Sequence, residues 1–407
     1  MGITPNIRFK GFTDDWEQRK LSELLYLSSE RNNGRYTRDD VLAASLGTEL
    51  QKKHIYFGLR ATDESVKNYK VVLPNDVIYT KSPIKGFPNG IIRTSKGENG
   101  IVPTLYCVYH SVDIINPSII QAYFESKERL DAYLVPLVNI GARNNVNITD
   151  KEFLDGLICI PNDKAEQDKI VDVLERLSNL ITLHQRKCDE TKKLKKFMLQ
   201  KMFPKKDEKK PEIRFAGFTD DWEQRKLSEL GEIMTGSTPS TSKSEYYSED
   251  GIPWVTPTDI NALTIFDTPK KLSKEGMKVA RIVPANTILC TCIASIGKNA
   301  LLTVTGSFNQ QINSLTPSMK NDAYFLLTES KFWSDKMKQM AASGTMQIVN
   351  KTAFSELKAM VPTLDEQKLI GSYFRILDDL ITLHQRKCDE IKEIKKFMLQ
   401  NMFPQKG

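Results

Sequence analysis

Apolar and small side chains recur along residues 165–203 at alternating steps of four and three positions. This spacing is typical of a helix that packs one face against a second helix in a coiled coil. The same spacing recurs after Pro362, and prolines lie just outside both segments, as expected at helix ends. The pattern predicts two helices of about 38 residues, each roughly 55 Å long at about 1.5 Å per residue. The predicted facing positions are Ile170, Leu174, Leu177, Ile181, His184, Cys188, Ile370, Phe374, Leu377, Ile381, His384 and Cys388.

The chain repeats its own ends. Gly11–Leu24 recurs letter for letter as Gly217–Leu230, and Leu180–Glu190 recurs as Leu380–Glu390. The copies lie 206 and 200 positions apart, whereas solenoid repeats have periods of about 20–50 residues. The chain therefore contains two copies of one module, each with constant ends around an unrelated middle. The predicted domains are residues 1–160 and 211–362, with helices at 161–204 and 363–404 and a charged linker at 205–210.

A lone helix with this apolar stripe would leave it exposed, so each predicted helix needs a partner. The copy in the other half is the obvious partner, and antiparallel pairing would separate the two variable domains that parallel pairing would crowd together. Lys195 interrupts the stripe, and Leu194 beside it could substitute for it. We therefore predict an antiparallel coiled coil.

The two middle regions contain short apolar runs typical of β-strands. Val71–Thr80 and Ile282–Thr291 are rich in β-branched residues and carry Pro and Asn turn signals. Helical segments are expected near Pro117–Tyr133 and Asn321–Met340. The predicted fold class is α+β: two mixed α/β domains joined by two long helices that form an antiparallel coiled coil with pseudo-two-fold symmetry.

The composition is that of an ordinary globular protein, with 40% hydrophobic and 27% charged residues among 407. No apolar run reaches the roughly 18 residues of a membrane span, and no signal peptide is evident, so we expect a cytoplasmic bacterial protein. The six cysteines form no C-x-x-C pair, which predicts reduced, mostly buried thiols.

The net charge of +7 lies mainly outside the middle regions. Residues 161–210 carry +5, whereas residues 1–160 carry +1, residues 211–362 carry 0 and residues 363–407 carry +1. If the middle regions bind nucleic acid, they must use local patches instead of bulk charge.

No catalytic signature is present. The chain lacks G-x-x-x-x-G-K-[ST], G-x-G-x-x-G, Asn/Asp-Pro-Pro-Tyr/Phe and H-E-x-x-H motifs, so we expect no nucleotide or methyl-donor site. His184 and Cys188, together with His384 and Cys388, could form a tetrahedral zinc set in an antiparallel pair. We favour the alternative, a semi-polar layer that fixes the helix register, and predict no catalytic residue and no bound metal.

Loops rich in hydroxyl, amide and basic groups are candidate nucleic-acid contacts. Hydroxyls and lysines contact phosphates, and amides can recognise base edges. As ordinary solvated loops the same segments would be unremarkable. The candidates in the second middle region are Ser237, Thr238, Ser240, Lys243, Asn309, Gln310 and Gln311, and those in the first are Lys81, Lys85, Arg93, Lys96, Arg143, Asn144 and Asn145.

With these motifs the chain resembles, over essentially its whole length, the specificity subunit of a type I restriction–modification system. The first half keeps RNNVN and IPNDKAEQDKI but has SSERNNGRY where the family's GSTPS is expected. The second half carries the family's motifs, GSTPS at Gly236, IPWVTPTDI at Ile252, IGK at Ile296, FNQQIN at Phe308 and DEQKLI at Asp365, and Lys298 of IGK joins the candidate contacts.

The resemblance implies a DNA-binding subunit without an active site of its own. Each variable domain would recognise one part of a split, asymmetric target in double-stranded DNA. The helices would set the gap and hold two methyltransferase subunits, which two restriction subunits then join. S-adenosylmethionine, ATP and Mg would be used by those partners for adenine methylation and cleavage, with none bound by this chain. The alternative is a coiled-coil scaffold that binds only proteins, which the neutral middle regions favour.

Overall fold

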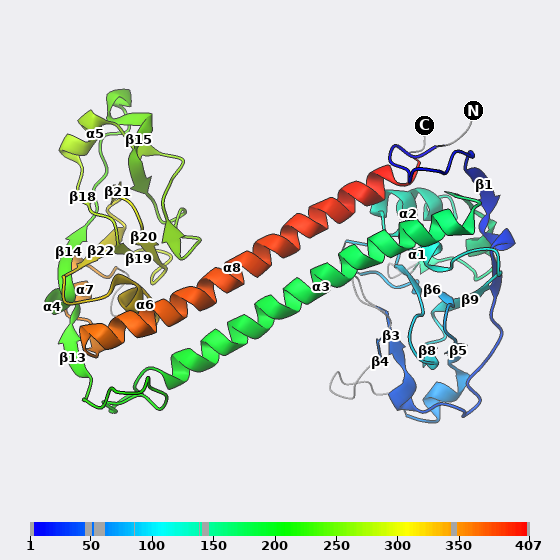
Figure 1. Ribbon diagram of the computed structural model, residues 1–407, viewed down its shortest axis with the longest axis horizontal. Helices are drawn as coiled ribbons and strands as arrows, with labels where there is room; N and C mark the ends of the chain where they lie inside the picture. Colours follow the sequence, from blue (N-terminus) through cyan, green and yellow to red (C-terminus); the bar gives the residue numbers. More distant parts are fainter. Residues whose placement is uncertain are drawn as a thin grey trace. The chain divides into compact units, whose positions relative to one another are not determined.

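Two long helices confirm the elements predicted from the heptad pattern. In the computed structural model, which describes residues 4–44, 51–52, 62–84, 86–137, 139–140, 146–342 and 348–404, α3 spans Lys164–Lys201 and α8 spans Leu364–Asn401 (Figure 1). No helix within these ranges is long and apolar enough to cross a membrane. The chain divides into two compact units whose boundary passes through both long helices. Unit 1 comprises Met1–Lys187 and His384–Gly407, and unit 2 comprises Cys188–Leu383.

Unit 1 contains a four-stranded antiparallel sheet in the order β2 (Leu25–Leu27), β9 (Cys107–Ser111), β6 (Val77–Tyr79) and β7 (Ile92–Thr94). Helices α1 (Ser118–Phe124) and α2 (Lys127–Leu134) follow the sheet and confirm the predicted helical segment (Figure 1). Ile119 and Ile120 share one core with Ile170 and Leu174 of α3. The other pairs are β5 (Lys70–Val72) with β8 (Gly100–Val102), β3 (Leu42–Ala43) with β4 (Gln51–Lys52), and β10 (Asn139–Ile140) with β11 (Val146–Asn147).

Unit 2 contains two mixed sheets. The first has the order β14 (Gly231–Thr235), β22 (Ile312–Pro317), β19 (Thr287–Thr291), β20 (Asn299–Leu302) and β16 (Thr264–Ile265). The second has the order β17 (Lys271–Leu272), β15 (Tyr247–Val255), β21 (Gly306–Phe308) and β18 (Ile282–Val283). The helices are α4 (Leu227–Leu230), α5 (Lys274–Val279), α6 (Ala323–Ala342) and α7 (Lys351–Ser355), of which α6 matches the predicted helix near residues 321–340.

The repeated N-terminal segment builds the same ladder in both units. It forms β1 (Glu17–Lys20), which pairs antiparallel with β12 (Leu157–Ile160). Its copy forms β13 (Glu223–Lys226), which pairs in the same way with β23 (Lys358–Val361). Each ladder therefore brings the start of a variable domain back to the strand that leads into a long helix.

Each unit is completed by the helix end of the other copy. In unit 1 the buried Trp16 ring lies 5.9 Å from the ring of Phe403, which follows α8. In unit 2 the buried Trp222 ring lies 5.7 Å from the ring of Phe203, which follows α3. The constant segments thus form two equivalent aromatic contacts, each made between the first copy and the second.

A buried ion pair also recurs in both units. Arg8 donates from Nε and Nη2 to the Glu166 carboxylate at 2.7 and 2.9 Å. Arg214 donates in the same way to Glu366 at 2.7 and 2.8 Å. Both glutamates are almost completely buried, so these two-pronged pairs fasten each N-terminal segment to the first turn of a long helix.

The helices run antiparallel within each unit, as predicted. In unit 1 the Cys388 thiol lies 3.8 Å from the Ile181 carbonyl oxygen, and in unit 2 the Cys188 thiol lies 3.8 Å from the Ile381 carbonyl oxygen. These are the same contact shifted by 200 positions. The predicted facing residues are buried at Ile170, Leu174, Cys188, Ile370, Phe374, Leu377 and Cys388, and half-buried at Leu177, Ile181, His184, Ile381 and His384.

His184 and His384 meet directly across the helices. Their Nδ1 atoms lie 3.1 Å apart, and burial together with the neighbouring His184 lowers the pKa of His384. Within the described residues, no group of three or more His, Cys, Asp or Glu side chains is gathered to hold a metal ion. The zinc arrangement that the sequence left open is therefore not formed in the described part of the chain, and the two rings share a hydrogen bond instead.

Lys195 lies on the line of facing residues between the two helices (the seam), contrary to the expectation that Leu194 could substitute for it. Leu194 is 45% exposed. The Lys195 ammonium lies 2.5 Å from Asp378, which also accepts a hydrogen bond from the Tyr324 hydroxyl at 3.1 Å. The long lysine stem can cross the seam because a carboxylate on the facing helix neutralises its charge. All six cysteines are buried and free, as predicted.

Candidate nucleic-acid interface

Two of the predicted contact loops meet at one end of the unit 2 sheets. The loop that follows β14 packs on the turn after β21, with the Gly236 N–H donating to Ile312 O at 3.0 Å and the Ser237 N–H to Phe308 O at 2.9 Å. A Cβ at position 236 would overlap the carbonyl oxygens of Phe308 and Asn309, so only glycine allows this approach. The Thr238 hydroxyl then donates to the Gln310 side chain.

Arg281 joins this cluster although no sequence motif marks it. Its backbone N–H donates to Ser237 Oγ at 2.9 Å, and its guanidinium donates to the Thr235 carbonyl. Trp254 supports the loop from within the domain by donating from Nε1 to Ser237 O at 3.1 Å. Since Arg281 lies 44 positions from Ser237, only the folded chain brings the exposed guanidinium to the loop.

The three amides of FNQQIN have different surroundings. Asn309 and Gln311 are half-buried and form a turn, in which the Gln311 N–H donates to Asn309 Oδ1 at 3.0 Å. Gln310 is exposed. Beside the turn, the Cys292 N–H donates to Gln311 O at 2.9 Å and begins the loop that ends at the exposed Lys298. Gln310 is thus the amide that can approach a base edge.

Exposed hydroxyls and a lysine continue the same loop. Ser240 and Ser242 share a hydrogen bond of 2.8 Å, and Lys243 donates to the Tyr246 hydroxyl at 3.2 Å. Thr238, Ser240 and Lys243 are all exposed. This surface offers hydroxyl, ammonium, guanidinium and amide groups, which are the groups that contact phosphates and base edges.

Two of the predicted contact cations of unit 1, Lys81 and Arg93, are buried beside carboxylates. Lys81 is buried and lies 2.8 Å from Asp150, which Lys70 also approaches to 2.6 Å. Burial alone would raise the pKa of Asp150, but the hydrogen bonds from the two lysines outweigh it and lower that pKa to about 2. Arg93 is also buried, 3.5 Å from Glu125, and burial lowers its pKa. Lys81 and Arg93 are therefore buried and paired in unit 1, and their contact with nucleic acid stays a prediction.

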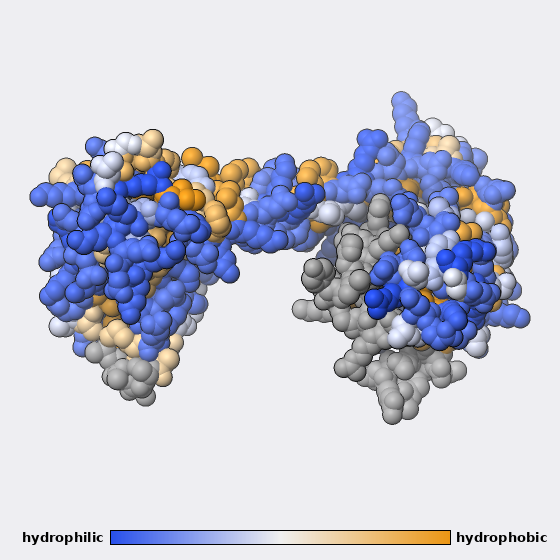
Figure 2. All heavy atoms as spheres, turned by 90° about the horizontal axis from the view of Figure 1, so that it is seen from below, coloured by the Kyte–Doolittle hydropathy of each residue, from blue (hydrophilic) through white to orange (hydrophobic). Residues whose placement is uncertain are grey.

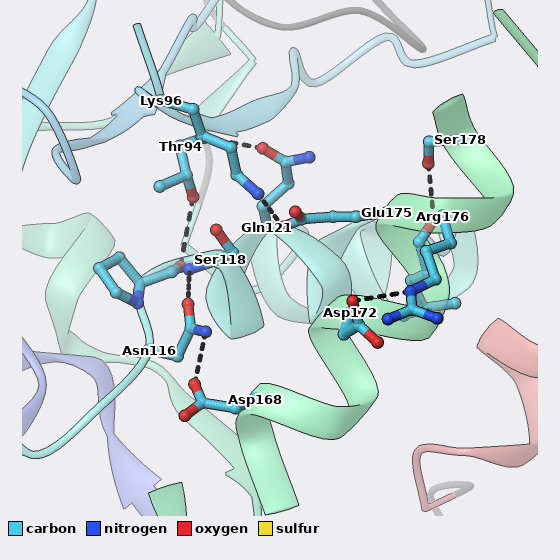
Figure 3. Close-up of polar contacts among 12 residues, drawn as sticks. Thr94, Lys96, Asn116, Ser118, Gln121, Asp168, Asp172, Glu175, Arg176 and Ser178 are labelled. Carbon is cyan, nitrogen blue, oxygen red and sulfur yellow. Dashed lines mark hydrogen bonds and ion pairs between the residues drawn. The ribbon is translucent and has the colours of Figure 1, made fainter. Parts of the chain in front are cut away.

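Lys96 is exposed and makes an ion pair with the long helix of unit 1. Its ammonium pairs with Glu175 of α3 (Figure 3). Nearby, Asn116 donates to Asp168 of α3 at 2.7 Å, and Thr94 donates to the Pro117 carbonyl at 3.2 Å. Lys96 therefore helps to fix the sheet and α1 against the long helix. The remaining candidates Lys85, Arg143, Asn144 and Asn145 lie outside the described residues.

The loop after β2 takes the position in unit 1 that GSTPS takes in unit 2. β2 pairs with β9 as β14 pairs with β22, and residues 29–35 then line an open hollow. Arg31 donates to Asn68 O at 3.0 Å, and Arg35 lies 2.6 Å from Glu30. The replacement of GSTPS by SSERNNGRY thus puts arginines where unit 2 has hydroxyls.

Part of the chain matches a known protein family in sequence. Residues 219–393 match the family described as type I restriction modification DNA specificity domain. The chain is 28% identical over 190 residues to the type I restriction enzyme MjaIX specificity subunit of Methanocaldococcus jannaschii, covering 45% of this chain and 44% of that protein. It is 28% identical over 184 residues to the HindI specificity subunit of Haemophilus influenzae, covering 42% and 39%. The matched region thus spans less than half the length of these relatives.

A solved structure shares the fold over the whole chain. The type I restriction–modification S subunit from M. genitalium has a TM-score of 0.69 at 14% identity and covers 100% of both chains. The chain is therefore similar to type I restriction–modification specificity subunits in sequence over part of its length and in fold over all of it.

Proposed function

We propose that this chain is the sequence-specific DNA-binding subunit of a type I restriction–modification complex in the bacterial cytoplasm. The observation that carries the proposal is the contrast between the two copies. The ladders, ion pairs and helix contacts are equivalent in both units, whereas the loops at the sheet ends differ. Two different loop sets on one frame suit a target with two unlike half-sites separated by an unread gap.

The physical basis of recognition is local, since the variable regions carry almost no net charge. Phosphate contacts from hydroxyls and cations would supply much of the affinity, which should fall steeply with salt. Base-edge contacts would supply specificity, at about 1–3 kcal/mol for each wrong base pair. With recognition sites about one helical turn apart, roughly 10 base pairs, both half-sites would face the same side of the duplex.

Exposed apolar side chains on the long helices support a role in binding two copies of one partner. Such side chains are visible at the surface among hydrophilic ones (Figure 2). Unit 1 exposes Leu180, Leu183, Ile394 and Phe397, and unit 2 exposes their repeat copies Leu380, Leu383, Leu194 and Phe197. We propose that two methyltransferase subunits dock here, that two restriction subunits join them, and that these partners use S-adenosylmethionine, ATP and Mg.

Exchanging one variable region tests this function. Residues 25–160 are replaced by the variable region of another specificity subunit, and methylated adenines are mapped in cells that also carry the partner methyltransferase. One half-site of the methylated sequence should change while the other half-site and the gap stay the same. The matched exchange of residues 231–362 should change only the other half-site. A change in both half-sites after either exchange would contradict the assignment.

A protein-only scaffold is the alternative, and DNA binding separates it from the proposal. In a gel shift with random duplex DNA and the methyltransferase subunit present, the DNA-binding subunit should retard the duplex. If the complex assembled and gave no shift at low salt, the scaffold would be the correct function.

A further inference from the structure

A small cavity in unit 1 is lined by an excess of positive charge. Its volume is about 210 Å³, and it lies among side chains of β7, the end of α1 and the last turns of α8. Apolar residues form most of its wall. The charged residues on its lining are Arg93, Lys392, Lys395, Lys396 and Glu125. The described lining residues therefore include four cations and one acidic residue.

The cations of the cavity differ in how far their side chains are exposed to solvent. The Arg93 side chain is 4% exposed and the Lys395 side chain 14%, whereas Lys392 is 48% exposed. The three lysines stand at positions i, i+3 and i+4 of α8, so they share one helix face. Arg93 comes from β7, a second element of the lining. An anion that entered here would pass exposed lysines before it reached a buried guanidinium.

Glu125 is shared between the two most buried cations. Its carboxylate lies 3.5 Å from Arg93 Nη1 and 2.5 Å from Lys395 Nζ, and it accepts a hydrogen bond from Gln121 at 3.2 Å. Lys392 also lies 3.5 Å from Asp389 along the helix surface. The two largely buried cations, Arg93 and Lys395, share the one Glu125 carboxylate, and two exposed lysines stand beside them, so the local field is positive. The lining thus favours an anionic ligand.

We propose that this cavity binds a phosphate group, and that in the DNA complex this group belongs to the DNA backbone. The source of the phosphate rests on the proposed function, whereas the phosphate site itself rests on the cavity. A guanidinium donates to two oxygens at once and lysines act as point charges. The donors come from β7 and α8, and a tetrahedral anion can accept from both elements at once.

The first experiment uses inorganic phosphate as the probe and the full chain as the receptor. The midpoint of thermal unfolding is measured against phosphate concentration at constant ionic strength, with acetate as a carboxylate comparison. A ligand that binds only the folded chain raises this midpoint. The increase should be smaller in Lys392→Ala/Lys396→Ala than in the control Lys192→Ala/Lys196→Ala, which removes the same charges from the equivalent positions of α3.

Glu125→Gln gives a prediction of opposite sign. It removes the one acidic residue among the described lining residues, so phosphate should stabilise this variant more than it stabilises the wild type. A merely structural role of Glu125 would give no such gain. Equal phosphate effects in the wild type and Lys392→Ala/Lys396→Ala, or a larger effect of acetate than of phosphate, would overturn the phosphate site.

The second experiment measures duplex DNA binding across a range of salt concentrations. A plot of log K for DNA binding against log salt concentration has a negative slope, and loss of one phosphate contact reduces the magnitude of this slope by about 0.9. The slope for Lys392→Ala/Lys396→Ala should be smaller in magnitude than the control slope by about that amount. Equal slopes would show that the cavity takes free phosphate and not the DNA backbone. If the wild type bound no DNA while the phosphate effects held, the proposed function would fail and the phosphate site would stand.

Discussion

The buried ion pair between Arg214 and Glu366 tests how strongly the segment before β13 is held to the first turn of α8. Glu366 is completely buried and the Arg214 side chain is 13% exposed. The variant Glu366→Gln keeps the shape of the side chain but leaves the guanidinium charge without a carboxylate. Breaking a buried ion pair in this way costs about 3–5 kcal/mol, because the remaining charge is not compensated. We therefore expect the free energy of unfolding of unit 2 to fall by about that amount.

Urea unfolding followed by tryptophan fluorescence measures this loss. Three of the four tryptophans, Trp222, Trp254 and Trp333, lie in unit 2, so the signal reports mainly on that unit. The double variant Arg214→Met/Glu366→Met removes both charges and should recover most of the lost stability, since an apolar pair of similar volume is often neutral in such a site. The equivalent change in unit 1, Glu166→Gln, is the matched control.

Two results would refute the reasoning. If Glu366→Gln lost less than about 1 kcal/mol, the pair would behave like a solvent-screened surface pair. If the double variant were as unstable as the single one, the loss would come from packing and not from an uncompensated charge.

Three further predictions concern Gly371, Glu329 and Gly236, which all lie in unit 2. A side chain at Gly371 would overlap Asp322, so Gly371→Val should destabilise the chain by about 1–3 kcal/mol through overpacking, and an unchanged urea midpoint would contradict this. Burial raises the pKa of Glu329 from 4.5 to about 8, so the folded chain keeps a proton that the unfolded chain has lost. Stability should therefore fall as pH rises from 4.5 to about 8, by up to about 5 kcal/mol, and urea midpoints of Glu329→Gln should lack this slope. Gly236→Ala should displace its loop from Asn309 and weaken duplex binding in a gel shift, and unchanged affinity with an unchanged fold would count against this interface.

The long helices were predictable because their signal is periodic and local. Spacings of four and three placed the seam residues on one face, and the prolines outside each segment marked ends within a few residues of α3 and α8. Antiparallel pairing followed from the duplication, since each stripe needed a partner. The exception is Lys195, which the apolar pattern treated as an interruption. Its partner Asp378 lies 183 positions away in the sequence, so a pattern of neighbouring residues could not predict this ion pair.

The candidate contacts were less predictable for the same reason. Lys81 and Arg93 lie near glycines and turn signals, which favours a loop, yet they pair with Asp150 and Glu125, 69 and 32 positions away. In contrast, the loops at GSTPS and FNQQIN were predictable from composition, because Gly, Pro, Ser and Asn favour turns. Arg281 carried no such signal and became visible only in the folded domain.

The equivalence of the two helix contacts has an evolutionary consequence. Ile181 and Cys188 lie in an eleven-residue stretch that recurs unchanged around Ile381 and Cys388. A genetic crossover between the two stretches would exchange everything on one side of the junction, yet each helix would still present the same side chains to its partner. The repeated stretch can therefore serve as a point at which variable domains of separate ancestry are joined in one reading frame with the same helix contact.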